Sequence, residues 1–365
     1  MLVGPAPVIH HGMSSGARNV LASCCLLVPI IQSALFDHGY SLAVAFCAVA
    51  GSVLAEALCG RGALSTRLRE GSAVLQGILF TLVLPASVPL YLPLFASLVA
   101  GILAKQVFGG VGSSWVPVPL FALLFARFVW PSSFGSGPDE SLLYQLESVR
   151  NALVKEGLSN PLDILKVSGF KPSVFDASVI RFVNRHILRG LSAELPFGYV
   201  DMLFLRDPGA LIADRGAFAF LLVSPLVMAA RLSRFRTSIL FLFTYLVLVF
   251  IADPLFYGQK TDSFAALFMP GQGGDILFTL FSGATLLCAV FLIQDSALCG
   301  VTLAGSALLA VFGACLSFLL RHVFHIPCGL LFALVLLSFI ALPVRYFETR
   351  FLARSRMAKR RNQSI

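Results

Sequence analysis

The sequence predicts an all-α, polytopic membrane protein with about ten transmembrane helices, and three observations support this. Apolar residues occupy 58% of the 365 positions and charged residues 12%, whereas a soluble domain is about half apolar and about a quarter charged. The mean hydropathy is +0.88. Apolar runs long enough to cross a bilayer recur along the chain and are separated by short polar turns.

The first membrane half, residues 1–130, contains five predicted spans. The first two cover 19–36 and 41–59, and a basic loop follows them. Residues 70–112 then provide two apolar runs joined by a proline-rich turn, without any charge between Glu70 and Lys105. Because no charge interrupts them, these runs predict a hairpin of two crossings. A fifth span is expected at 115–130.

A long polar segment separates the two membrane halves. Residues 131–215 contain no run long enough to cross, and a connector of this length indicates a functional element. The second membrane half, residues 216–345, contains the remaining five predicted spans, at 217–231, 237–252, 275–294, 298–320 and 327–345. The basic tail, 346–365, follows the last span.

The distribution of positive charge predicts the orientation. The stretch 345–365 carries seven Lys or Arg residues against one Glu, so it supplies +6 of the formal net charge of +9. Such a tail after a span is a cytoplasmic anchor and a contact for anionic lipid, rather than evidence for nucleic-acid binding. An even number of spans then places both termini in the cytoplasm and 131–215 outside, as expected in a bacterial inner membrane. Lys260 and Arg321, in short outer loops, run against this assignment.

An internal echo indicates two inverted five-helix halves. Residues 70–73, which open the third span, resemble residues 215–218, which open the sixth. Five spans in each half would give the halves opposite orientations, a plan common among transporters.

The stretch EGSAVLQGILFTLVLP and the later AKQVFGGVG resemble the RnfD/NqrB family, the membrane subunits of the Rnf complex and of Na⁺-translocating NADH:quinone reductase. Lys105, Gly109, Gly110 and Gly112 belong to this pattern. The glycines tolerate positive φ and close backbone approach, so the four residues are candidate cofactor contacts. Where the family continues with an Asn-Pro-rich segment, this chain has SSWVPVP at 113–119.

The resemblance implies a membrane subunit of an ion-translocating electron-transport complex, coupling NADH or ferredoxin oxidation to movement of Na⁺ or H⁺, with no independent activity. The chain has no nucleotide-binding glycine fingerprint, and none of its eight cysteines has CxxC spacing. The flavin-carrying, iron–sulfur and NADH-binding subunits would therefore be partner chains. Two alternatives stay open: a solute channel or secondary transporter without a redox role, and a structural subunit that has lost its flavin.

The resemblance also implies flavin, as FMN or riboflavin. Related subunits carry a similar run to Ser282-Gly283-Ala284-Thr285, and SGAT-like sequences mark the threonine that bears FMN. In the family's membrane subunit, however, the acceptor lies in the outward loop, where Asn160 replaces it beside Ser159. An amide cannot form the phosphoester, and apolar neighbours should bury Thr285. We therefore predict that any flavin is held non-covalently among the spans. A small-residue packing face is the competing interpretation of 282–285.

Acidic residues near span ends are candidates for an ion path, because carboxylates are seldom placed in a membrane without a function. These candidates are Glu56, Asp253, Asp275 and Asp295. Glu56 could equally be a paired carboxylate, and the others could be hydrated at the interface. His322 and His325 have helical spacing, but two imidazoles without a third ligand do not predict a metal site. We therefore expect no metal.

Overall fold

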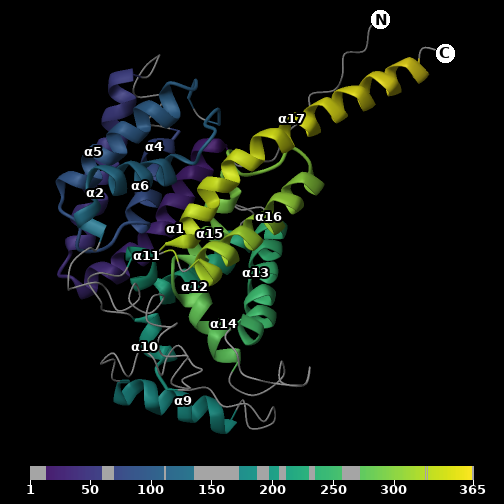
Figure 1. Cartoon of the computed structure of the whole chain (residues 1–365). Coiled ribbons are helices and arrows are strands. Elements are labelled where there is room, and N and C mark those ends of the chain that lie inside the picture. The colour runs from purple at the N-terminus through teal and green to yellow at the C-terminus, as the bar shows by residue number, and fades with distance from the viewer. Residues whose placement is uncertain are drawn as a thin grey trace, which may run out of the picture.

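The computed structural model describes residues 14–59, 70–110, 112–134, 172–186, 197–204, 211–229, 235–256, 272–324, 326 and 328–363. All the regular structure in these residues is helical, and one isolated backbone bridge joins Pro85 to Leu211. Figure 1 shows the helices gathered in one body, with α9 and α10 at one end and α17 extending beyond the other. The predicted all-α membrane fold is confirmed.

The first half is built around α2. Its elements are α1 (Ser15–Phe36), α2 (Tyr40–Cys59), α4 (Ser72–Leu82), α5 (Tyr91–Ala100), the π-helix η1 (Gly101–Gln106), α6 (Val118–Val129) and the 3₁₀ turn η2 (Pro131–Phe134). Missing side chains let the backbone of α2 approach its neighbours. A Cβ at Gly51 would stand 2.2 Å from the carbonyl oxygen of Leu94 on α5, and one at Gly77 on α4 would stand 2.7 Å from the Cα of Val49. Small residues are the usual means of close helix packing in membranes.

The second half has its own sequence of helices. The outer elements before it are α9 (Val174–His186), α10 (Tyr199–Leu203) and α11 (Ile212–Arg215). It continues with α12 (Ala217–Ala229), α13 (Phe235–Phe256), α14 (Gln272–Phe281), α15 (Thr285–Val290), the 3₁₀ turn η6 (Leu292–Gln294), α16 (Leu303–Phe318), the π-helix η7 (Leu319–Val323) and α17 (Gly329–Gln363). Here α13 packs on α16 and α16 on α17, while α1 and α12 join the two halves.

Every predicted span coincides with an apolar helix or helix pair. Among the described residues, four helices are long and apolar enough to cross a membrane alone, and they lie within 15–36, 40–59, 303–323 and 329–354. The other predicted spans correspond to shorter apolar helices of 10–17 residues. The eighth span differs from the prediction of one continuous crossing, because the chain interrupts it between α14 and α15.

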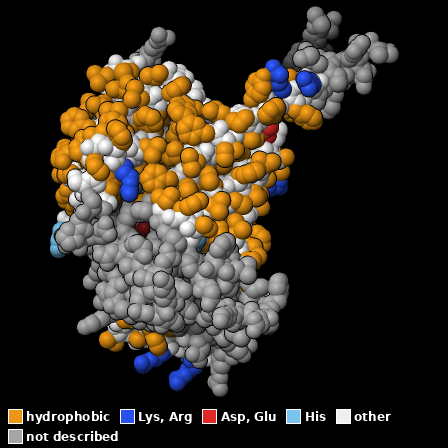
Figure 2. Space-filling model, in the orientation of Figure 1, with side chains coloured by type: hydrophobic (Ala, Val, Ile, Leu, Met, Phe, Trp, Pro, Cys, Tyr) orange, Lys and Arg blue, Asp and Glu red, His pale blue; other side chains and the backbone are white. Residues whose placement is uncertain are grey.

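Large apolar side chains cover much of the outside of the helical body. Phe46, Leu58, Phe128 and Leu303 are each more than two-thirds exposed, and Figure 2 shows hydrophobic side chains over most of the described surface on the face in view. A patch of this extent is what lipid would cover. The surface therefore agrees with the composition in placing the protein in a membrane.

Side-chain contacts define two opposite ends of the body. At one end, Asn19 near the start of α1 donates to the carbonyl of Glu70, and Arg345 on α17 donates to that of Cys299. We call this the α1-start end. At the other end, where α1 finishes, Arg215 forms an ion pair with Asp37 at 2.9 Å. The 22 residues of α1 span about 33 Å between the two ends.

Candidate functional site

A buried ion pair lies in the first half near the α1-start end. The Lys105 ammonium donates to the Glu56 carboxylate and, at 2.9 Å, to the Ser72 hydroxyl, which itself donates to Glu56 at 3.3 Å. The three residues are at most 5% exposed. The sequence prediction of Glu56 as a paired carboxylate is confirmed, and its partner comes from a span 49 residues further along.

Local backbone geometry brings these three residues together. Gly71 adopts a left-handed φ of +65° and lets α4 begin at Ser72, directly beside α2. Lys105 lies in the π-helix η1, whose wider turn follows α5 without a break. The amide of Gly110 then closes this turn on the Lys105 carbonyl at 2.9 Å. π-Helical turns inside α-helices are frequent at functional sites.

The glycines after Lys105 serve backbone conformation. Gly109, Gly110 and Gly112 have φ between +83° and +103°, a region that other residues rarely adopt. A Cβ at Gly110 or Gly112 would meet no heavy atom within 4 Å. The expectation of close backbone approach at these two positions is therefore wrong, and their positive φ supplies the physical reason for glycine. Their role as cofactor contacts stays a prediction.

A second site lies at the break in the eighth span. Gly283 and Ala284 take left-handed φ values of +67° and +57°, which end α14 and start α15. The two freed amides donate to the Asp214 carboxylate of α11, at 3.0 Å from Gly283 and 2.7 Å from Ala284. The interpretation of 282–285 as a small-residue packing face is thus replaced by a helix break with an acidic cap.

Arg321 occupies the opposite side of this break. It is 5% exposed, and its guanidinium donates to the carbonyls of Thr279 and Ser282 at 3.3 and 3.2 Å. It also donates to the hydroxyls of Ser282, Thr285 and Tyr245, at 2.6, 3.2 and 3.2 Å. These carbonyls belong to the end of α14, where a cation complements the helix dipole. Arg321 is therefore an interior residue, which corrects its assignment to an outer loop.

The two sites occupy corresponding places in the two halves. Each combines a left-handed glycine at a helix start, Gly71 or Gly283, with a buried cation on a π-helix, Lys105 or Arg321. The structure therefore relates the third span to the eighth, whereas the sequence echo related the third to the sixth. Gly216, the glycine of that echo, has φ −93° and shares no left-handed turn with Gly71. The chemistry differs between the sites: the first carries a titratable pair and the second a permanent charge.

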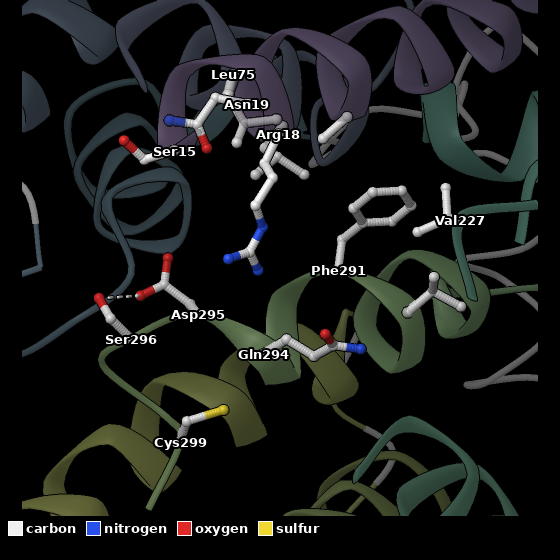
Figure 3. Close-up of a pocket in the computed structure, with 13 residues that line it drawn as sticks. Ser15, Arg18, Asn19, Leu75, Val227, Phe291, Gln294, Asp295, Ser296 and Cys299 are labelled. Carbon is white, nitrogen blue, oxygen red and sulfur yellow. Dashed lines mark hydrogen bonds between the residues drawn. The ribbon is translucent and has the colours of Figure 1, made fainter. Parts of the chain in front are cut away.

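A pocket of about 420 Å³ opens at the α1-start end, between α1, α4, α12 and the turn after η6. Figure 3 shows Arg18 of α1 and Asp295 of that turn directed into it from opposite sides. Asp295 Oδ1 accepts from the amide of Ala297 at 2.8 Å and the hydroxyl of Ser296 at 3.4 Å. Partial removal from water raises the pKa of the half-buried Asp295 carboxyl above its usual range, although these hydrogen bonds lower it.

The predicted flavin residues divide into two groups. Ser282, Gly283, Ala284 and Thr285 lie at the helix break, and Thr285 is 1% exposed, as its apolar neighbours predict. The Thr285 hydroxyl donates to the carbonyls of Thr279 and Ser282, both at 2.7 Å. Ser159 and Asn160 lie outside the described residues, so the replacement of the family's threonine stays a sequence observation.

The acidic candidates are not brought together where the structure describes them. Glu56 is in the first-half ion pair, whereas Asp295 borders the pocket. The side chains of Asp253 and Asp275 lie outside the described part of the chain. Within that part there is no group of three or more His, Cys, Asp and Glu residues arranged for a metal ion. An ion path through Asp253, Asp275 or Asp295 stays a prediction.

Sequence reasoning missed Asp214, Tyr245 and Arg321 as site residues. Arg321 follows a long apolar run, and a buried partner for that charge was the available signal. Asp214 lies at the end of the polar segment 131–215, and its neighbours Ile212 and Ala213 are buried too. The amide of Ile212 donates to the Leu84 carbonyl at 2.9 Å, so this segment returns to the body before α12.

The fold and these sites define a class: a polytopic α-helical membrane protein with two corresponding halves, each holding a buried cation beside an irregular helix. The sequence profile of the NQR2, RnfD, RnfE family matches residues 2–350. The chain belongs to this family.

Proteins named as the RnfD component of an ion-translocating oxidoreductase complex are similar to the chain over almost its whole length. The protein of Aliivibrio salmonicida (strain LFI1238) is 25% identical, covering 94% of this chain and 95% of its own. That of Stutzerimonas stutzeri is 25% identical over 89% and 88%. That of Escherichia coli (strain ATCC 8739) is 24% identical over 93% and 94%.

Proposed function

We propose that this chain is the membrane subunit of an ion-translocating electron-transport complex of the Rnf type. Its family and the names of its relatives support this role. Electrons from NADH or ferredoxin enter at partner subunits, which carry the nucleotide, iron–sulfur and further flavin chemistry. The chain has no activity alone and supplies part of the path of Na⁺ or H⁺.

The Glu56–Lys105 pair is the observation that carries this proposal. Burying two charges costs several kcal/mol per ion, which their attraction only partly returns. Ionisable groups inside a membrane protein are therefore usually functional. A buried lysine exchanges its proton more readily than an arginine, so the pair can hold a proton or a cation in transit. We place ion entry at this pair, and Ser72 completes its oxygen surroundings.

The orientation of the chain follows from its positive charge. The basic tail of α17 and the α1-start end are assigned to the cytoplasmic face of the inner membrane, which puts α9, α10 and the rest of 131–215 outside. The Glu56–Lys105 pair then lies near the cytoplasmic face, where an ion would enter an outward path. Arg321, in the corresponding place of the other half, lies toward the outer face and sets a fixed positive charge there.

The proposal includes flavin, as FMN or riboflavin, held non-covalently. Thr285 does not fit a phosphoester, because its buried hydroxyl is already hydrogen-bonded to two carbonyls. When bound, a flavin supplies one- and two-electron transfer, and the protein supplies its orientation and electrostatic surroundings. Mass spectrometry of the chain from the purified complex tests for the flavin and its linkage.

Ion uptake by the reconstituted complex tests the role of the pair. The variant Glu56→Gln keeps the side-chain shape and removes the charge, and we expect redox-driven ion uptake to fall at least about tenfold. Glu348→Gln is the matched control, because that carboxylate serves to cap Val301 and Thr302 at the start of α16. Equal uptake in wild type and Glu56→Gln contradicts the assigned ion path. Solute flux without any electron donor would indicate a transporter instead.

A further inference from the structure

We propose that the pocket at the α1-start end binds the headgroup of an ethanolamine phospholipid, with the phosphate on Arg18 and the ammonium on Asp295. Two opposite charges and an apolar floor meet within this one cavity of about 420 Å³. Such a site would bind lipid whether or not the chain takes part in electron transfer.

The two charges face the cavity without neutralising each other. Arg18 is exposed, and neither its guanidinium nor the Asp295 carboxylate forms an ion pair within the described part of the chain. Asp295 Oδ1 is engaged by Ala297 and Ser296, which leaves the Oδ2 side of the carboxylate toward the pocket. A ligand that carries both a negative and a positive group satisfies both residues at once.

The remaining walls fit the apolar part of a lipid. Beneath the charges the cavity is lined by Leu75, Leu79, Val227, Val290 and Phe291. Leu79, Val227 and Val290 are at most 8% exposed, so they form a closed floor rather than an outer surface. A small polar solute would leave these side chains without apolar contact, whereas the glycerol and upper acyl carbons of a phospholipid would cover them.

The position of the pocket supplies the ligand. The first turn of α1 and the turn after η6 lie at the end of apolar helices, which is the depth of the phospholipid headgroups. Charged pockets between transmembrane helices at this depth are known as lipid-headgroup sites. An anionic lipid would satisfy Arg18 and be repelled by Asp295. A choline headgroup has no N–H to donate to a carboxylate, so both charges together favour ethanolamine.

Native mass spectrometry of the intact complex with defined lipids tests the proposal. The purified complex is exchanged into detergent containing equal amounts of phosphatidylethanolamine, phosphatidylcholine and phosphatidylglycerol of the same acyl chains. We expect wild type to retain the ethanolamine lipid at least about tenfold more than the choline lipid, because a charge-assisted hydrogen bond is involved. Asp295→Asn should remove this preference, and Arg18→Gln should reduce retention of both lipids. Arg350→Gln, which alters an exposed arginine on α17, should change neither.

Three results would overturn the proposal. Equal retention of ethanolamine and choline lipids by wild type would do so without any variant, so failure of a variant to assemble leaves the test intact. Preferential retention of phosphatidylglycerol would assign an anionic-lipid site instead. Loss of bound flavin rather than lipid in Arg18→Gln would assign the pocket to the cofactor. None of these results bears on ion uptake, which tests the proposed function separately.

Discussion

Asp214 and Arg321 hold the break in the eighth span from opposite sides. The carboxylate accepts hydrogen bonds from the two amides that start α15, and the guanidinium donates to two carbonyls that end α14. Backbone groups freed inside a membrane must be satisfied by protein, because lipid offers no hydrogen bonds. Each charge also lies at the end of the helix dipole that stabilises it. The irregular turn at 282–284 is therefore a stable feature of the fold.

Replacing either residue should destabilise the second half. Arg321→Met leaves the carbonyls of Thr279 and Ser282 without their donor, and Asp214→Leu removes the acceptor from the amides of Gly283 and Ala284. Each change should cost about 1–3 kcal/mol or more, since the groups left are buried. Arg321→Lys should cost less than Arg321→Met because it keeps the charge but loses the fork of donors. Thermal unfolding of the purified protein in detergent would measure all three, and unchanged midpoints would contradict the assigned roles.

Two adjacent positions at this break should respond in opposite ways. Gly283→Ala places a Cβ 3.0 Å from the Arg321 guanidinium carbon at a φ of +67°, so we expect a clear loss of stability. Ala284 already adopts a φ of +57° with a side chain, so Ala284→Gly should be neutral or stabilising. The same unfolding measurement compares the pair. Equal destabilisation by both changes would mean that backbone conformation does not control this site.

The sequence predicts the helices of this fold better than it predicts their irregularities. All ten spans are found because a continuous apolar run is a sufficient signal for a crossing. The break at 282–284 depends on Asp214 and Arg321, which lie 69 and 39 residues away from their partners. Ala284 gives no local sign of positive φ. Such tertiary determinants cannot be derived from composition or periodicity.

The pairing of charges shows the same limit. Glu56 and Lys105 are both conspicuous in apolar surroundings, and burial cost predicts that each needs a partner. Their meeting depends on close packing of α2 with α5 through Gly51, and on the π-helix that turns Lys105 inward. Neither feature has a sequence signal of its own. The glycine run after Lys105 is correctly predicted to be special, but positive φ rather than close approach explains Gly110 and Gly112.

A comparison of two glycines separates conformation from function after Lys105. Gly110 and Gly39 have φ values of +102° and +91°, and a Cβ at either would meet open space. Gly110→Ala and Gly39→Ala should therefore cost similar stability, about 1 kcal/mol each. If the loop after Lys105 also serves the complex, Gly110→Ala should lower electron transfer by more than Gly39→Ala does. Equal turnover in the two variants would assign these glycines a conformational role alone.

The proposed orientation predicts which cysteines a reagent can reach. Arg185 on α9 and Ala353 on α17 are exposed and lie on opposite sides in the assigned topology. In a background without the eight native cysteines, Arg185→Cys should react with an impermeant maleimide in intact cells. Ala353→Cys should react only after the membrane is opened. Protection of position 185 together with labelling of position 353 in intact cells would reverse the orientation.

The last prediction concerns covalent flavin. Arg321 supplies a positive charge beside Thr285 that could pair with a phosphate, yet the threonine is 1% exposed and its hydroxyl donates to two carbonyls. A phosphoester there would remove both hydrogen bonds and require space that the packed break does not offer. We therefore expect no flavin fluorescence on the denatured chain after electrophoresis, and flavin released into the supernatant by denaturation of the complex. Fluorescence that survives denaturation and disappears in Thr285→Val would name Thr285 as the acceptor, while disappearance only in Ser159→Ala would name the outer segment.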